Sequence, residues 1–141
     1  MIFEELQKEN IKTMKEHDKV AHEIIALVFG KCKNEAIDGA YPDRKLPDAQ
    51  TLKIIQKTIK ELEEEKTAFK KANREEKVLE LARQKSILEA YLPKQLSEEE
   101  IRNIISSLSD KTIPSVMKHF KANYAGQVDN SLVSKMAKEF N

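Results

Sequence analysis

The stretch YLPKQLSEEEI, residues 91–101, ends one helix and begins another. Pro93 disfavours helical backbone at Leu92, so a helix that arrives from the N-terminal side has to stop here. Ser97 precedes Glu100 by three residues, which is the spacing of a capping box, in which each side chain accepts the backbone N–H of the other residue. We therefore predict that one helix ends near the tyrosine and that a new one begins after the serine.

A domain boundary is expected at this interruption. We place it between a helical N-terminal domain, residues 1–93, and a C-terminal domain, residues 94–141. The spacing of apolar residues predicts helices in the second domain at about 98–108, at about 114–123 and after Asp129, whose side chain can cap the last of them. The C-terminal domain is therefore predicted to be a small three-helix unit.

The N-terminal domain is expected to consist of long antiparallel helices. Its apolar residues recur at helical spacing over residues 2–16, 19–37, 48–72 and 75–91, and residues 38–47 have the composition of a loop. The helix at 48–72 carries a heptad-like seam suited to packing against another helix. That seam consists of Leu52, Ile55, Ile59, Leu62 and Phe69. Because the chain also has only 3 Gly and 4 Pro, too few for many tight turns, the predicted fold class is all-α.

Single positions in this domain carry more specific expectations. Asp18 stands before the second helix as an N-cap, and Asp48 or Thr51 before the third. Gly30 interrupts the second helix at a cost of about 1 kcal/mol against alanine, so close contact between helices is expected there. Cys32 lies in an apolar stripe and is expected to be a partly buried core residue, without an internal disulfide because it is the only cysteine.

Acidic and basic residues are interleaved on the helix at 48–72. The clustered carboxylates could suggest a metal site. However, Lys57 and Glu61 stand four residues apart, and Glu63 and Lys66 stand three apart, so we expect ion pairs on a solvated helix face.

No motif for catalysis or cofactor binding is found in the sequence. It has neither the GxxxxGK[ST] phosphate loop nor the GxGxxG fingerprint. His17 and His22 stand five residues apart, which does not place two metal ligands on one helical face. We therefore expect no catalytic residue, no cofactor and no metal, and a chain that is not an enzyme by itself.

The protein is expected to reside in the cytoplasm. Residues 1–10, MIFEELQKEN, show no basic start followed by an apolar run, so we expect no signal peptide. No stretch approaches the roughly 18 apolar residues of a membrane span. The 25 basic and 24 acidic residues leave a net charge of +1, so no overall field demands a nucleic-acid partner.

A local excess of positive charge points to a ligand. Residues 111–138 contain five lysines and one acid, Asp129, which gives 5 − 1 = +4. Lys118, Lys121 and Tyr124 follow one another at helical spacing beside a turn, and such an arrangement could meet a phosphate chain. The candidate RNA-contacting residues are Lys118, Lys121, Tyr124, Gly126, Lys135 and Lys138. An ordinary solvated face is the simpler explanation of the charges alone.

Three stretches give the chain a family resemblance. They are KNEAIDG (33–39), LEAYLPKQLSEEEI (88–101) and AGQVDNSLVSKMAKEF (125–140), of which the middle one is the most specific. Through them the chain resembles the YqeY-like family over nearly its whole length. The domain of that family is similar to the helical tail of the B subunit of the glutamine-dependent aspartyl/glutamyl-tRNA amidotransferase. The resemblance implies a helical N-terminal domain followed by three C-terminal helices.

In that amidotransferase the tail helps to hold the tRNA, and the amidation chemistry lies in other domains. The resemblance therefore implies an RNA partner, and it implies that carbon–nitrogen ligase activity with glutamine as amido donor is a label inherited from the larger subunit. The chain departs from the family at two places. Lys118 follows Val116 and Met117 where the family has a glycine. In the turn before the last helix, Gly126 and Asp129 remain but Gln127 and Asn130 replace an arginine and a glycine. The loss of the basic residue weakens the case for a phosphate contact at the turn itself.

Three functions remain in competition. The first is a non-catalytic module that binds tRNA or another RNA through the C-terminal domain. The second is a protein-interaction adaptor that docks a partner protein on the helices of residues 48–91, and the third is a carbon–nitrogen ligase. A lysine-dominated C-terminal surface would favour the first function, an exposed apolar stripe on 48–91 the second, and a buried polar pocket the third. The oligomeric state is left open.

Overall fold

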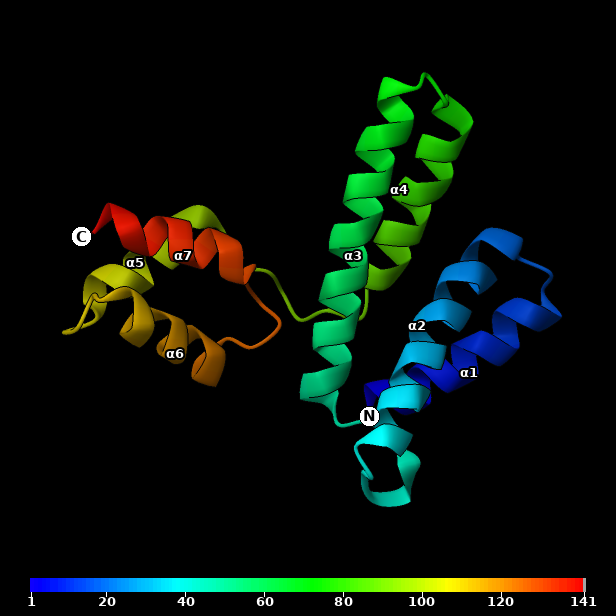
Figure 1. The fold of residues 1–141 in the computed structure, drawn as a ribbon, viewed down its shortest axis with the longest axis horizontal. Coiled ribbons are helices and arrows are strands. Elements are labelled where there is room, and N and C mark those ends of the chain that lie inside the picture. Colours follow the sequence, from blue (N-terminus) through cyan, green and yellow to red (C-terminus); the bar gives the residue numbers. More distant parts are fainter. Residues whose placement is uncertain (141) are drawn as a thin grey trace. The chain divides into compact units, whose positions relative to one another are not determined.

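The structure is a computed structural model that describes residues 1–140. Within these residues it contains seven α-helices, one short 3-10 helix and no strand (Figure 1), which confirms the predicted all-α class. In chain order the helices are α1 (Ile2–Lys15), α2 (Lys19–Asp38), η1 (Pro42–Arg44), α3 (Asp48–Lys71), α4 (Glu75–Glu89), α5 (Glu98–Ser107), α6 (Ile113–Asn123) and α7 (Asn130–Glu139).

The chain separates into two compact units. Unit 1 comprises Met1–Tyr91 and holds α1 to α4, and unit 2 begins at Leu92 and holds α5 to α7. The division falls at the interruption in the sequence from which the two domains were predicted. A domain boundary between residues 93 and 94 also requires that each unit folds independently. That requirement stays a prediction.

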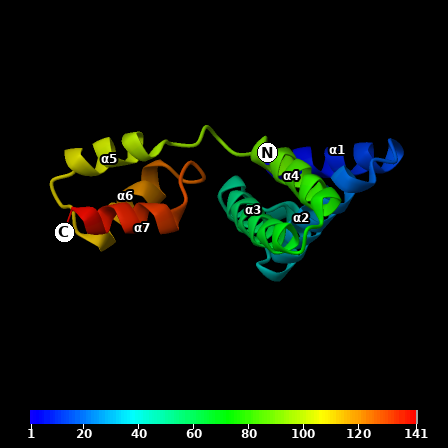
Figure 2. The ribbon, with the colours of Figure 1, turned by 90° about the horizontal axis from the view of Figure 1, so that it is seen from above.

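Unit 1 is built from two helical hairpins. Helices α1 and α2 form one and α3 and α4 the other, and α2 packs against both members of the second hairpin (Figures 1 and 2). Most of the side chains buried between them are apolar, and these come from all four helices and the loop before α3. They include Phe3, Leu6, Ile24, Ile25, Val28, Leu46, Ile55, Leu62, Leu81 and Leu88.

The buried stripe of α3 is rotated relative to the predicted seam. Thr51 and Thr58 are buried, whereas Leu52 and Ile59 are only partly buried. The burial of these threonines costs little because each hydroxyl donates a hydrogen bond to a backbone carbonyl, as Thr58 does to Ile54 at 2.8 Å. The seam prediction was wrong at these positions because it counted apolar residues alone.

The start of α3 also differs from the prediction. Pro47 is its N-cap, and neither Asp48 nor Thr51 caps the helix with its side chain. The Asp48 carboxylate instead accepts the backbone N–H of Ile2, the first residue of α1, at 2.9 Å. Asp48 therefore satisfies a free N–H at the start of another helix, where a negative charge is favourable.

Of three expectations for α2, one is wrong and two are confirmed. A Cβ added at Gly30 would meet no atom within 4 Å, so the predicted close contact between helices is wrong at this position. Cys32 is fully buried, which confirms its place in the core. The predicted cap is also confirmed, since the Asp18 carboxylate accepts the N–H of Ala21 at 3.2 Å.

Unit 2 is a three-helix unit around its own apolar core. The core residues are Ile101, Ile105, Val116, Phe120, Val128, Val133, Met136 and Ala137. The predicted capping box is confirmed, because Ser97 Oγ accepts the N–H of Glu100 at 3.2 Å and Glu100 Oε1 accepts the N–H of Ser97 at 3.4 Å. Asp129 caps α7 by accepting the N–H of Ser131 at 2.9 Å, also as predicted.

Candidate nucleic-acid interface

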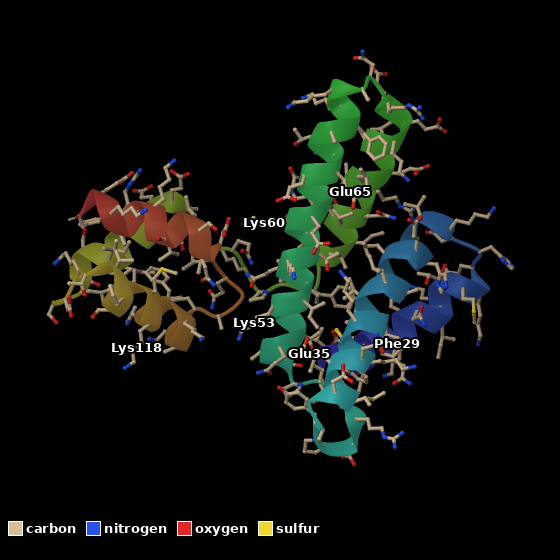
Figure 3. The ribbon with its side chains drawn as sticks, in the orientation of Figure 1. Phe29, Glu35, Lys53, Lys60, Glu65 and Lys118 are labelled. Atoms are coloured by element: carbon tan, nitrogen blue, oxygen red, sulfur yellow. The ribbon has the colours of Figure 1, made fainter. Side chains whose placement is uncertain are left out.

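The outer side of α6 carries two of the candidate lysines. Val116 and Phe120 are fully buried in the core of unit 2 and fix the inner side of the helix. Lys118 and Lys121, three residues apart, are both exposed. Figure 3 shows Lys118 extending outward from α6. Both ammonium groups are therefore accessible to an anion in solution.

The outer side of α7 carries the other two lysines. Val133, Met136 and Ala137 bury its inner side, and Lys135 and Lys138 are exposed. Helices α6 and α7 pack against one another within unit 2. The structure thus brings the lysines together as two pairs, one on each of two adjacent helices.

The charges of these lysines are not neutralised internally. Within residues 1–140 none of the four has an acidic side chain at ion-pair distance. The acidic Glu98 and Glu139 lie instead beside Arg102, at 3.9 and 3.7 Å. The outer sides of α6 and α7 therefore offer positive point charges, which is the form in which lysines contact phosphates.

Tyr124 does not project outward with the lysines. Its ring centroid lies 5.4 Å from that of Phe120 and 6.0 Å from that of His119, and its side chain is partly buried against the core of unit 2. The residue is the C-cap of α6 and follows the buried Phe120 by four residues, which places its ring on the inner side of the helix. The expectation of a shared face with Lys118 and Lys121 is corrected to a packing role at the end of the helix.

Gly126 forms the turn between α6 and α7. Its φ of 79° lies in the left-handed region, which favours glycine because a Cβ is strained there. Its carbonyl accepts a hydrogen bond from the side-chain amide of Gln95 at 2.7 Å, and the neighbouring Gln127 carbonyl accepts the N–H of Leu96 at 2.9 Å. The backbone of the turn is thus held by the segment that precedes α5.

The ion pairs on α3 are partly those predicted. Glu63 pairs with Lys66 at 3.9 Å, as expected, and more closely with Lys85 of α4 at 2.7 Å. The hydrogen bond with Lys85 lowers the pKa of Glu63 below its ordinary value. The predicted pair of Lys57 with Glu61 is wrong, because Glu61 lies 3.8 Å from Lys31 of α2 instead.

Sequence reasoning missed a groove that follows from this change of partners. It lies between α2 and α3 in unit 1 and includes Lys31, Lys53 and Lys57 in its lining. The signal was present in the sequence, because Lys53, Lys57 and Lys60 recur at steps of four and three residues. The assumption that glutamates of the same helix neutralise them concealed it.

The described residues contain neither a metal-ligand cluster nor an exposed thiol. No group of three or more His, Cys, Asp or Glu side chains is arranged to hold a metal ion. Burial raises the pKa of the Cys32 thiol to about 11, and the nearby Glu35 carboxylate adds to the rise, so the group is a poor nucleophile near neutral pH. In the same part of the chain, none of the helices combines the length and the apolar character needed to cross a membrane.

Comparison with known proteins places the chain in a family. No curated protein matches it. The family model described as YqeY-like protein matches residues 3–140, nearly the whole chain. The chain therefore belongs to the YqeY-like protein family.

Proposed function

We propose that this protein is a non-catalytic RNA-binding module, with tRNA as its preferred RNA. The observation that carries the proposal is the set of four exposed lysines on the outer sides of α6 and α7, to which residues 1–140 supply no acidic partner. The resemblance of the family to the tail of a tRNA amidotransferase subunit supports tRNA over other RNAs. The proposal locates the protein in the cytoplasm.

The lysines would contact phosphates and not bases. A lysine ammonium is a compact charge on a flexible stem, so the contacts carry little sequence information and binding depends strongly on salt. For four contacts to single-stranded RNA, log affinity should fall against log salt with a slope of about −3. Tyr124 and Gly126 support the surface by fixing the turn between α6 and α7.

No specific observation favours the two alternatives. The adaptor function requires an exposed apolar stripe on residues 48–91, but among the large hydrophobic side chains described there only Leu79 is strongly exposed, at 71%. The ligase function requires a polar pocket with an activated nucleophile. The described groove between α2 and α3 is open, and the thiol of Cys32 lies buried with a raised pKa.

The test is a fluorescence anisotropy titration of labelled tRNA with the full chain. At low salt we expect binding that weakens by more than about tenfold between 50 and 200 mM KCl. Lys118→Glu combined with Lys121→Glu should abolish binding. The matched control combines Lys12→Glu and Lys15→Glu, which are equally exposed on α1 and also three residues apart. Equal binding by the two double variants, or no binding by the wild type at low salt, would overturn the proposal.

A further inference from the structure

The groove between α2 and α3 is a second place where positive charge converges. It has a volume of about 380 Å³ and opens to solvent. Helix α2 contributes Lys31 and Glu35 to its walls, and α3 contributes Gln50, Lys53, Lys57 and Thr58. Three lysines and one glutamate therefore line a space large enough for a small ligand.

The lysines of the α3 wall have no acidic partner within residues 1–140. Neither Lys53 nor Lys57 takes part in an ion pair. Lys31 has only a long pair with Glu61, at 3.8 Å between two side chains that are each more than two-fifths exposed. Exposed pairs of this kind are weak and give way to a competing anion. The net positive charge of the groove is thus available to a ligand.

The arrangement on α3 is unfavourable for the helix by itself. Lys53 and Lys57 stand four residues apart, Lys57 and Lys60 stand three apart, and like charges at these spacings destabilise a helix. Figure 3 shows Lys53 and Lys60 extending from the same side of α3. Further along α3, Glu63 and Lys66 stand three residues apart and form a pair of opposite sign. A bound anion would remove the repulsion between the lysines.

The remaining polar groups of the groove suit an oxyanion. Gln50 lies in the first turn of α3 and offers amide N–H donors beside the positive end of the helix dipole. Thr58 donates its hydroxyl hydrogen to the Ile54 carbonyl of its own helix, so it lines the groove without offering a donor to a ligand. Glu35 stands opposite as an acceptor for a hydroxyl group next to the bound anion.

We propose that this groove binds a phosphate group that is attached to a hydroxyl-bearing sugar. Lys53 and Lys57 hold the phosphate oxygens, Gln50 donates a further hydrogen bond, and Lys31 joins them on release from Glu61. Glu35 accepts a hydrogen bond from the sugar. The phosphate can belong to a free nucleotide or to an RNA backbone, since both present the same chemistry to the groove.

Nuclear magnetic resonance can separate these sources. The ¹⁵N-labelled full chain is titrated with uridine 5′-monophosphate, with uridine, and with an RNA of eight uridines. The protein carries Lys118→Glu and Lys121→Glu, so that RNA binding by unit 2 does not interfere. We expect the amide signals of residues 31–35 and 50–58 to shift with the monophosphate and not with uridine. If the RNA shifts these signals at a much lower concentration than the monophosphate does, the ligand is a backbone phosphate. If the two ligands act at equal concentrations, the ligand is a free nucleotide.

Variants of the same protein decide whether the lysines are responsible. Lys53→Gln with Lys57→Gln should abolish the shifts. The matched control, Lys8→Gln with Lys12→Gln, removes two exposed lysines four residues apart on α1 and should leave them unchanged. The proposal is overturned if neither phosphate ligand shifts the groove signals, or if the two double variants respond alike. The anisotropy test depends on lysines of α6, whereas this titration depends on lysines of α3, so failure here leaves the proposed RNA-binding function standing.

Discussion

The side-chain amide of Gln95 donates a hydrogen bond to the backbone carbonyl of Gly126 at 2.7 Å, across 31 residues of sequence. Beside it, the N–H of Leu96 donates to the carbonyl of Gln127 at 2.9 Å. These bonds join two of the three stretches through which the chain resembles its family. The stretch at 88–101 thus holds the turn that the stretch at 125–140 forms.

The same bonds predict where the chain is open to proteases. Gln95 and Leu96 are held by hydrogen bonds to the turn between α6 and α7, whereas Lys94 immediately before them is exposed near the start of unit 2. We expect limited trypsin digestion to cut after Lys94 and to leave a stable N-terminal fragment, identified by mass spectrometry. Prolonged resistance at this site would show that the two units form one indivisible core.

The capping box of α5 should contribute measurably to stability. Ser97→Ala removes the acceptor for the Glu100 N–H and should lower the free energy of unfolding by about 1 kcal/mol. Urea denaturation, monitored by circular dichroism, measures the change in the free energy of unfolding. Ser107→Ala is the control on the same helix, because that exposed hydroxyl bonds only to the Ile104 carbonyl near the end of the helix. Equal effects of the two changes would mean that the box contributes nothing specific.

Local signals explain what the sequence could predict. Ser97, Asp18 and Asp129 cap helices through N–H groups two or three residues away, so the pattern alone defines each bond. The Asp48 bond to Ile2 and the Glu61 pair with Lys31 cross between helices. Such partners are set by tertiary packing, which no spacing within one helix reveals.

On the candidate surface, too, the features local to one helix could be predicted and those that need two helices could not. The exposure of Lys118 and Lys121 followed from helical periodicity and the buried positions between them. The same periodicity places Tyr124, four residues after the buried Phe120, on the inner side of α6, so grouping it with Lys118 and Lys121 was a misreading of the spacing. The lysine spacing on α3 was visible in the sequence, but the groove itself could not be predicted because it needs residues from two helices in contact.

Substitution by alanine should have opposite effects on stability at Gly30, within α2, and at Gly39, its C-cap. Gly30 lies within the helix with open space around its Cβ position, so Gly30→Ala should raise the free energy of unfolding by about 0.5–1 kcal/mol. At Gly39 a new Cβ would lie 2.6 Å from the ring of Tyr41 and 3.1 Å from the Glu35 carbonyl. Gly39→Ala should therefore destabilise the fold by about 1 kcal/mol or more. Urea denaturation of both variants tests the contrast, and a loss of stability in Gly30→Ala would contradict it.

The buried thiol of Cys32 should make stability depend on alkaline pH. Burial raises its pKa from 9.0 to about 11, Glu35 adds to the rise, and a hydrogen bond with Thr51 acts in the opposite direction. Because the folded state holds this proton more tightly than the unfolded state, the thiol favours folding below about pH 9. That contribution is lost as the pH rises through the folded pKa, so the relevant window is pH 9 to 11.

The comparison of wild type with Cys32→Ala isolates this group. Burial raises the pKa of Tyr91 to about 12, and the hydrogen bond with Glu63 raises the pKa of Lys85, but both groups are present in both proteins and cancel in the difference. We expect the free energy of unfolding to fall more steeply between pH 9 and 11 in the wild type than in the variant. Parallel pH profiles would refute the prediction. In the same protein at pH 8, a thiol reagent should label Cys32 only after denaturant is added, because the native thiol is buried and carries about a hundredfold less thiolate than an exposed cysteine.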